Sequence, residues 1–196
     1  MKRGVIALMI GGAALVGSGF LHQHVLHLHG YKFGHRSEPM IHAKSEFTFT
    51  VHAPMAQAFP LFGPQGERLW AGPHWDPQFV YPKLAQDIEG AVFNIRHGHH
   101  DAIWVNTAFD AKAGHAAYAY VIEGKLATRI DVRLTPVSPQ TTSVRVMYER
   151  TALDPSAEEE IGEMAQADAT MGPEWEKAIA EYLGKHESGA PHVPTL

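Results

Sequence analysis

The stretch of sequence that decides the fold spans residues 91–151 and reads AVFNIRHGHHDAIWVNTAFDAKAGHAAYAYVIEGKLATRIDVRLTPVSPQTTSVRVMYERT. It divides into segments rich in β-branched and aromatic residues, separated by short turns of polar residues and glycine. The predicted strands are Ala91–Arg96, Ala102–Phe109, Ala116–Ile122, Leu126–Pro136 and Thr142–Thr151. Because no helical segment lies between them, we expect them to pair in order as an antiparallel meander.

The last two predicted strands alternate between charged and apolar residues, which indicates the face that each side chain occupies. On the outer face we place Arg129, Asp131, Arg133, Arg145, Met147 and Glu149, and on the inner face Ile130, Val132, Leu134, Val144, Val146 and Tyr148. Ion pairs across these strands would account for the outer charges without any function.

Further elements flank the meander. Residues 45–51 alternate as a half-buried strand, and Pro54 opens a short helical stretch that ends at Gly63. An irregular, proline-rich region follows. After the meander, Asp154 is a suitable cap for a long helix, whose apolar face has a gap at Asp168. Gly172 and Pro173 should kink or divide this helix and let it bend. Its expected apolar residues are Ile161, Met164, Met171, Trp175, Ile179, Tyr182 and Leu183.

This order of elements predicts an α+β fold in which a curved antiparallel sheet wraps around one long C-terminal helix. Three segments also resemble the START-like (SRPBCC) superfamily, which includes polyketide cyclase/dehydrase-like and lipid-transfer proteins. They are FTFTV at 47–51 with the following AP, YERTAL at 148–153, and GPEW at 172–175. The resemblance implies a helix-grip fold with a pocket for a hydrophobic ligand under the last helix, and no universal catalytic motif.

The N-terminus has the pattern of an export signal. Lys2 and Arg3 precede an uncharged, mainly apolar run from Gly4 to Leu21. Such a run fits either a signal peptide or a thin transmembrane anchor, and no A-x-A cleavage site is present. Since the basic residues precede the run, we expect the body to face the periplasm or exterior. The expected organisation is a signal or anchor at 1–21, a His-rich linker at 22–44, the domain at 45–186 and a flexible tail at 187–196.

Composition limits the possible functions. A formal net charge of −5 argues against a nucleic-acid partner. Since the chain has no cysteine, a disulfide, a thiolate zinc site and a lipid-modified cysteine anchor are excluded. The chain also lacks a P-loop, a dinucleotide-binding G-x-G-x-x-G, an H-E-x-x-H and a G-x-S-x-G motif.

Histidine is abundant, at 14 residues, and forms two clusters. Imidazoles at His22, His24, His27 and His29 are plausible ligands for weakly bound zinc or copper. The alternative is an amphipathic interfacial segment that follows an anchor. The second cluster, at 97–101, lies at a predicted hairpin turn and is more typical of an exposed polar turn. No cofactor is otherwise expected.

The expected cavity gives a set of candidate ligand-binding residues. They combine apolar bodies with polar tips, or belong to the helix that covers the sheet: Trp75, Trp104, Asn106, Tyr118, Tyr120, Met164, Met171 and Trp175. His74 beside Asp76 could supply a general base, although Trp70 and Trp75 in this segment are more typical of packing anchors.

Three functions follow from these observations. The first is non-catalytic binding or transfer of a hydrophobic small molecule or lipid. The second is a cyclase/dehydratase- or hydrolase-type enzyme that uses a His/Asp or Tyr/Arg set in the same cavity. The third is metal handling by the His-rich segment. Polar side chains that converge inside the pocket would favour the enzyme, whereas a purely apolar lining would favour the binding protein.

Overall fold

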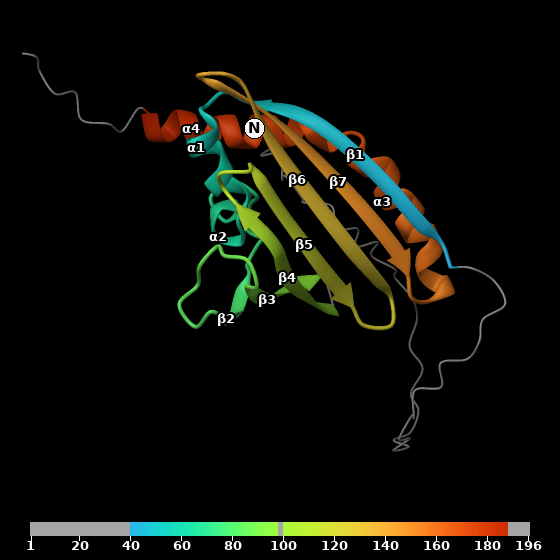
Figure 1. Cartoon of the computed structure of the whole chain (residues 1–196). Helices are drawn as coiled ribbons and strands as arrows, with labels where there is room; N and C mark the ends of the chain where they lie inside the picture. Colours follow the sequence, from blue (N-terminus) through green and yellow to red (C-terminus); the bar gives the residue numbers. More distant parts are fainter. Residues whose placement is uncertain (1–39, 98–99, 188–196) are drawn as a thin grey trace, which may run out of the picture.

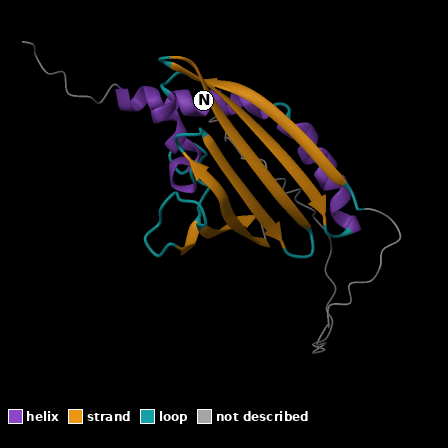
Figure 2. Ribbon diagram, in the orientation of Figure 1, coloured by secondary structure: helices purple, strands orange, loops and turns teal. Residues whose placement is uncertain are grey.

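The computed structural model describes residues 40–97 and 100–187 of the chain. One seven-stranded sheet forms a layer, and the helices lie against one face of it (Figures 1 and 2). The strands are β1 (His42–Val51), β2 (Gln78–Tyr81), β3 (Val92–His97), β4 (His100–Asp110), β5 (His115–Ile122), β6 (Leu126–Ser138) and β7 (Thr141–Ala152). Their spatial order is β1-β7-β6-β5-β4-β3-β2, with every neighbouring pair antiparallel. The predicted meander is therefore confirmed as β3 to β7.

The first strand returns to pair with the last. Phe47 lies opposite Val146, and Phe49 lies opposite Val144. All four side chains are buried, as their alternation predicts. β1 begins at His42, three residues before the predicted start at Ser45.

At the other edge of the sheet is β2, a strand that the sequence analysis did not predict. It spans only four residues and lies between Pro77 and Pro82, so its pattern is too short to separate from an irregular loop.

Three short helices connect β1 to β2. They are α1 (Met55–Ala58), the 3₁₀ helix η1 (Phe59–Phe62) and α2 (Pro64–Glu67). Only glycine fits at position 66, because a Cβ there would lie 1.8 Å from the Pro60 carbonyl oxygen. This close approach folds the segment back on itself and places Glu67 over the interior.

The C-terminal segment is divided into two helices, which is one of the two outcomes that the sequence predicts. After η2 (Pro155–Ala157), the chain forms α3 (Glu158–Asp168) and α4 (Met171–Glu187). The predicted cap is confirmed, since the Asp154 side chain accepts a hydrogen bond from the Ser156 backbone N–H. The predicted inner face is also confirmed, because Ile161, Met164, Met171, Trp175 and Ile179 are all buried.

The expected bend at Gly172 and Pro173 is wrong. The helices separate earlier, at residues 169–170, and α4 runs unbroken from Met171. Pro173 lies in the first turn of α4, where its missing N–H breaks no helical hydrogen bond. A Cβ on Gly172 would lie 3.2 Å from the Thr48 carbonyl oxygen, so this glycine packs α4 tightly against β1.

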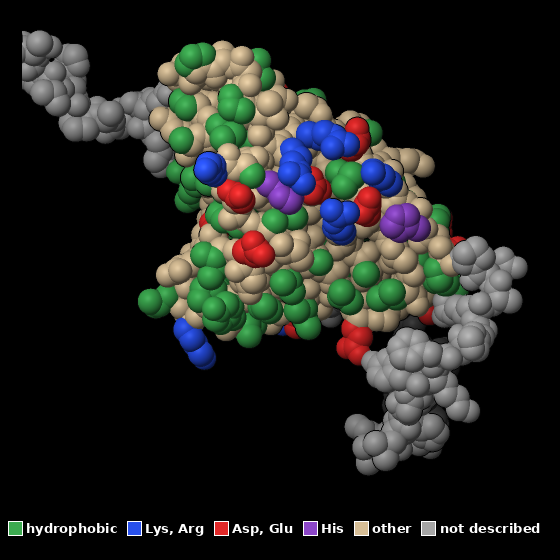
Figure 3. Space-filling model, viewed as in Figure 1, with side chains coloured by type: hydrophobic (Ala, Val, Ile, Leu, Met, Phe, Trp, Pro, Cys, Tyr) green, Lys and Arg blue, Asp and Glu red, His purple; other side chains and the backbone are tan. Residues whose placement is uncertain are grey.

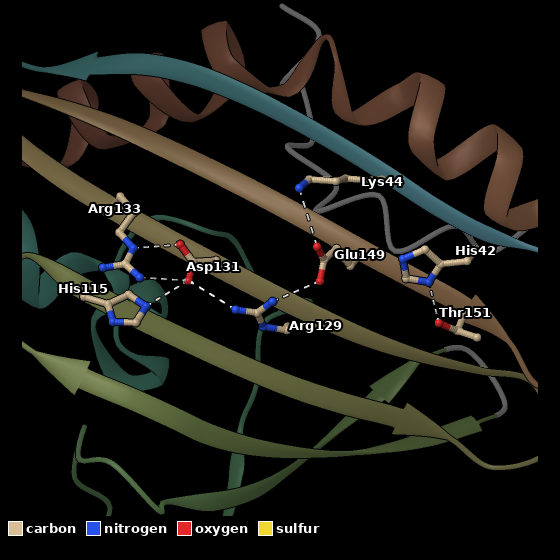
Figure 4. A network of polar contacts seen from close by, with 8 residues as sticks. All are labelled: His42, Lys44, His115, Arg129, Asp131, Arg133, Glu149 and Thr151. Atoms are coloured by element: carbon tan, nitrogen blue, oxygen red, sulfur yellow. Dashed lines mark hydrogen bonds and ion pairs between the residues drawn. The ribbon is translucent and has the colours of Figure 1, made fainter.

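The outer face of the sheet carries the predicted charges over β1, β5, β6 and β7 (Figure 3). Arg129 forms a cross-strand ion pair with Glu149 at 3.1 Å. Asp131 contacts both His115 and Arg133 at 2.9 Å (Figure 4). These contacts confirm the prediction that the alternating charges form cross-strand ion pairs.

Among residues 40–97 and 100–187, no helix is long and apolar enough to cross a membrane. The predicted signal or anchor at 1–21 and most of the His-rich linker lie outside the described residues.

Candidate functional site

A cavity of about 30 Å³ lies between the sheet and the junction of α3 with α4. That volume holds about two water molecules. Aromatic side chains fill most of the remaining interior between the two layers. The cavity is lined by Glu67, Trp75, Trp104, Tyr118, Tyr120, Ile130, Val132, Tyr148, Arg150, Asp168, Met171 and Trp175.

The aromatic walls come from both layers and pack against one another. Trp104 stacks on Tyr120, with ring centroids 4.2 Å apart, and meets Trp75 edge-on at 5.4 Å. From α4, Trp175 meets Trp70 edge-on at 5.1 Å and Phe47 at 5.2 Å. These contacts hold the ring planes in fixed orientations around the cavity.

Hydrogen bonds from the core fasten the segment that carries Glu67. Three buried side chains donate to backbone carbonyls of residues 61–64: Trp70 Nε1 to Leu61 at 2.8 Å, Trp75 Nε1 to Pro64 at 2.9 Å, and the Tyr118 hydroxyl to Phe62. Asp87 accepts the backbone N–H groups of Gln65 at 2.8 Å and Gly66 at 3.2 Å. These hydrogen bonds therefore hold the backbone that precedes Glu67 in a fixed conformation.

Glu67 is buried, at 6% exposure, and its side chain lines the cavity. Burial raises the pKa of its carboxyl well above the usual 4.5, and the nearby Asp87 carboxylate raises it further. Among the described residues, no group donates a hydrogen bond to this carboxyl. The cavity wall thus includes an acid that keeps its proton to unusually high pH.

The opposite wall contains a buried ion pair. Arg150 Nη1 and Nη2 donate to the two carboxylate oxygens of Asp168, at 2.5 and 3.1 Å. Ser45 donates a further hydrogen bond to Asp168, and the Arg150 guanidinium lies 4.3 Å from the Tyr148 ring centroid. Because Asp168 is the last residue of α3, this pair fixes the helix junction to β7 and β1.

Six of the eight predicted ligand-binding residues line the cavity: Trp75, Trp104, Tyr118, Tyr120, Met171 and Trp175. Asn106 and Met164 are buried elsewhere. The Asn106 amide donates to the Ile88 carbonyl at 3.0 Å and so supports the loop before β3.

The sequence analysis did not single out Glu67 and Arg150 as site residues, and it noted Asp168 only as a gap. Two signals were available. Arg150 has the same strand parity as the inward-facing Val146 and Tyr148. Asp168 lies four residues after Met164 and three before Met171, on the buried face of the helices. A charged residue at each of two inward positions indicates a buried pair. No comparable pattern marks Glu67, whose placement depends on the fold of residues 58–66.

The predicted histidine sites receive no support from the described residues. Asp76 pairs with Arg68 at 3.1 Å and with Gln78 at 2.7 Å, and no hydrogen bond or ion pair joins it to His74. Among the described residues, no group of three or more His, Asp or Glu side chains is placed to hold a metal. The cluster at His22–His29 lies outside them and stays a prediction.

The fold of this chain is similar to the folds of several solved structures. No protein-family model and no curated protein matches the sequence. Solved structures do match. Norcoclaurine synthase from Thalictrum flavum, in complex with dopamine and hydroxybenzaldehyde, is 11% identical with a TM-score of 0.55, covering 87% of this chain and 100% of that one. The chain has the helix-grip fold.

Two further structures support the same assignment. Ara h 8.0201 is 14% identical, with a TM-score of 0.50, and covers 74% of this chain and 99% of that one. A protein from Thermobifida fusca is 13% identical, with a TM-score of 0.53, and covers 71% and 92%. Norcoclaurine synthase and Ara h 8.0201 belong to the SRPBCC/Bet v 1 superfamily, so the predicted resemblance is supported at the level of the fold.

Proposed function

We propose that this protein binds a small hydrophobic molecule that contains a ring, in the cavity between the sheet and α3–α4. The observation that carries the proposal is the enclosed lining, in which aromatic side chains surround a few convergent polar groups. Such a combination is typical of small-molecule sites. The norcoclaurine synthase structure of the same fold contains dopamine and hydroxybenzaldehyde, which are both ring compounds.

The size of the cavity argues for a small ligand rather than a lipid. At about 30 Å³ it is smaller than the roughly 150 Å³ of a cavity that binds benzene. Entry of a ring must therefore enlarge the cavity. Met171 is the most adaptable side chain of the lining, because its thioether side chain is unbranched, and it lies where α4 begins.

Filling the cavity tests the proposal. We would titrate the protein with p-cresol and follow tryptophan fluorescence, in wild type and in Val132→Phe, which adds a ring to the lining. Val137→Phe adds the same ring at a position with 66% exposure and serves as the matched control. Binding should be lost in Val132→Phe and kept in Val137→Phe. Equal binding by both variants, or no binding by wild type, would contradict the proposal.

A second candidate is an enzyme that uses the same cavity. The convergence of Glu67, Tyr148 and Arg150 on one enclosed space favours it, because a carboxyl with a raised pKa can transfer protons near neutral pH. Mass spectrometry of molecules extracted from wild type and Glu67→Gln separates the two functions. A binding protein should carry the same molecule in both, whereas an enzyme should accumulate a different one in the variant.

We further propose that the domain acts outside the cytoplasm, on the basis of Lys2, Arg3 and the uncharged run that follows. Residues 1–44 would be fused to a reporter that is active only after export. An active reporter is expected, and an inactive, soluble cytoplasmic fusion would contradict the proposal.

A further inference from the structure

We propose that the ligand is an organic cation, a small aromatic amine whose ammonium group pairs with the carboxylate of Glu67. This inference rests on the proposed binding function and specifies the chemical class of the ligand.

The Glu67 carboxyl accepts no hydrogen bond from the described residues. Three buried donors around its segment are already used, since those of Trp70, Trp75 and Tyr118 bond to the carbonyls of residues 61–64. The buried Trp175 Nε1 in the same lining has no partner among the described residues and does not donate to Glu67. A carboxyl in an apolar cavity wall that accepts no hydrogen bond is destabilised relative to one in water. The ionised form of this carboxyl needs a donor, and an ammonium supplies up to three donors together with the complementary charge.

The aromatic rings of the cavity lining also favour a cation. Ring faces attract cations, and the cavity has tryptophan and tyrosine rings from β4, β5, β7 and α4. The one arginine in the lining does not oppose a cation, because both of its terminal nitrogens pair with Asp168. An anionic ligand would instead meet the Glu67 carboxyl with no unpaired cation in the described lining.

Binding of an ammonium ion next to Glu67 should also release a proton, and this release can be measured. In the empty protein Glu67 keeps its proton to higher pH than an ordinary glutamate, because burial raises its pKa, and the ligand arrives as an ammonium ion. Formation of the ion pair leaves a carboxylate beside the ammonium and releases one proton to solvent. Affinity should therefore rise about tenfold per pH unit below the pKa of Glu67 in the empty protein. The other titratable or charged groups nearby are Asp87, Tyr118, Tyr148 and the Arg150–Asp168 pair.

The test is calorimetric titration of the full chain with benzylamine and with benzyl alcohol, its uncharged analogue of similar shape, in phosphate and in Tris at pH 7. The dependence of the heat on buffer gives the number of protons released. Benzylamine should bind at least tenfold more tightly than benzyl alcohol and release up to one proton per site. Glu67→Gln should lose both the preference and the release while it still binds the alcohol. Glu149→Gln, on the outer face, should behave like wild type.

Two results would overturn the inference in distinguishable ways. If the alcohol binds as tightly as the amine with no proton release, the ammonium site is wrong and the cavity still binds ring compounds. If neither probe binds, the proposed binding function fails as well. Should Glu67→Gln not fold, the pH profile of wild type decides, because an amine affinity that does not change with pH contradicts an exchange of a proton for an ammonium.

Discussion

Arg150 and Asp168 form a buried ion pair with two hydrogen bonds, which joins β7 to the last residue of α3. Their side chains are 4% and 5% exposed. The pair therefore lies in a medium that screens its charges weakly, next to the place where the two C-terminal helices meet and at the wall of the cavity.

Removal of one partner should destabilise the fold strongly. Asp168→Ala leaves Arg150 buried without its carboxylate and should lower the free energy of unfolding by about 3–5 kcal/mol. Replacement of both partners, as in Arg150→Met with Asp168→Leu, should recover most of this loss because no unpaired charge remains. Urea denaturation measures the free energy of unfolding of the single and the double variant. A double variant as unstable as the single one would show that the pair itself, rather than the orphaned charge, stabilises the fold.

The corresponding outer-face variant is the control for this prediction. Arg129 pairs with Glu149 but is 57% exposed, so solvent screens the interaction. Arg129→Gln should lower the free energy of unfolding by less than about 1 kcal/mol.

The Asp131 network should make stability depend on pH in the acid range. Burial alone would raise the pKa of Asp131, but the hydrogen bonds from Arg133 and His115 outweigh it and hold that pKa below the usual 3.8. A depressed carboxyl pKa stabilises the folded state above pH 4, and this stabilisation is lost as the pH falls through the folded value. Asp131→Asn should therefore lower the free energy of unfolding by about 1–3 kcal/mol at pH 7. The free energies of unfolding of the two proteins should converge as the pH falls through the folded pKa of Asp131, and a gap that stays constant as the pH is lowered would contradict this origin.

Glu67 should have the opposite effect on the pH dependence. Since its folded pKa is raised, its contribution is fully present below the unfolded value near 4.5 and is lost as the pH rises. Glu67→Gln should match wild type at pH 4 and become the more stable protein at neutral pH. The difference can grow by at most about 1.4 kcal/mol per pH unit for one proton. A difference that stays constant from pH 4 to pH 8 would show that Glu67 is not buried as described.

Two glycines should respond to alanine with opposite signs. Gly66→Ala places a Cβ against the Pro60 carbonyl oxygen and should unfold the segment that carries Glu67, with a loss above about 3 kcal/mol. Gly162 lies within α3 with open space around it, so Gly162→Ala should stabilise the helix by about 0.5–1 kcal/mol. Thermal unfolding of both variants checks the prediction, and equal melting temperatures would contradict it.

Much of the fold can be predicted from the sequence because strands in a meander pair with their neighbours. Alternation at Ile130, Val132 and Val146 gives the inner face directly, and short turns leave few alternatives for the pairing. β2 and the start of β1 could not be predicted in this way. β2 has only four residues between two prolines, which is too short for an alternation of apolar and polar residues to be recognised.

The position at which the C-terminal helix divides could not be predicted from the sequence, for a different reason. Proline and glycine at 172–173 suggested a break there, yet Pro173 lies in the first turn of α4 and Gly172 allows close packing on β1. Which of these roles a proline or glycine takes depends on the surface that the helix meets, and local sequence does not contain that surface.

The site was predictable in its aromatic part and not in its polar part. Trp104, Tyr118 and Tyr120 follow from strand parity and side-chain type. Glu67 follows from neither, because its direction depends on the hydrogen bonds that Trp70, Trp75 and Tyr118 donate to the backbone of 61–64.

The most direct test of the central claim, that the cavity binds a ring compound, is NMR of the methionine methyl groups during titration with p-cresol. Met171 lines the cavity, whereas Met147 lies on the outer face of β7. The Met171 methyl signal should shift in a saturable way and show a nuclear Overhauser effect to the ring protons of p-cresol, while the Met147 signal stays in place. A Met171 signal that does not move at saturating p-cresol would contradict the account.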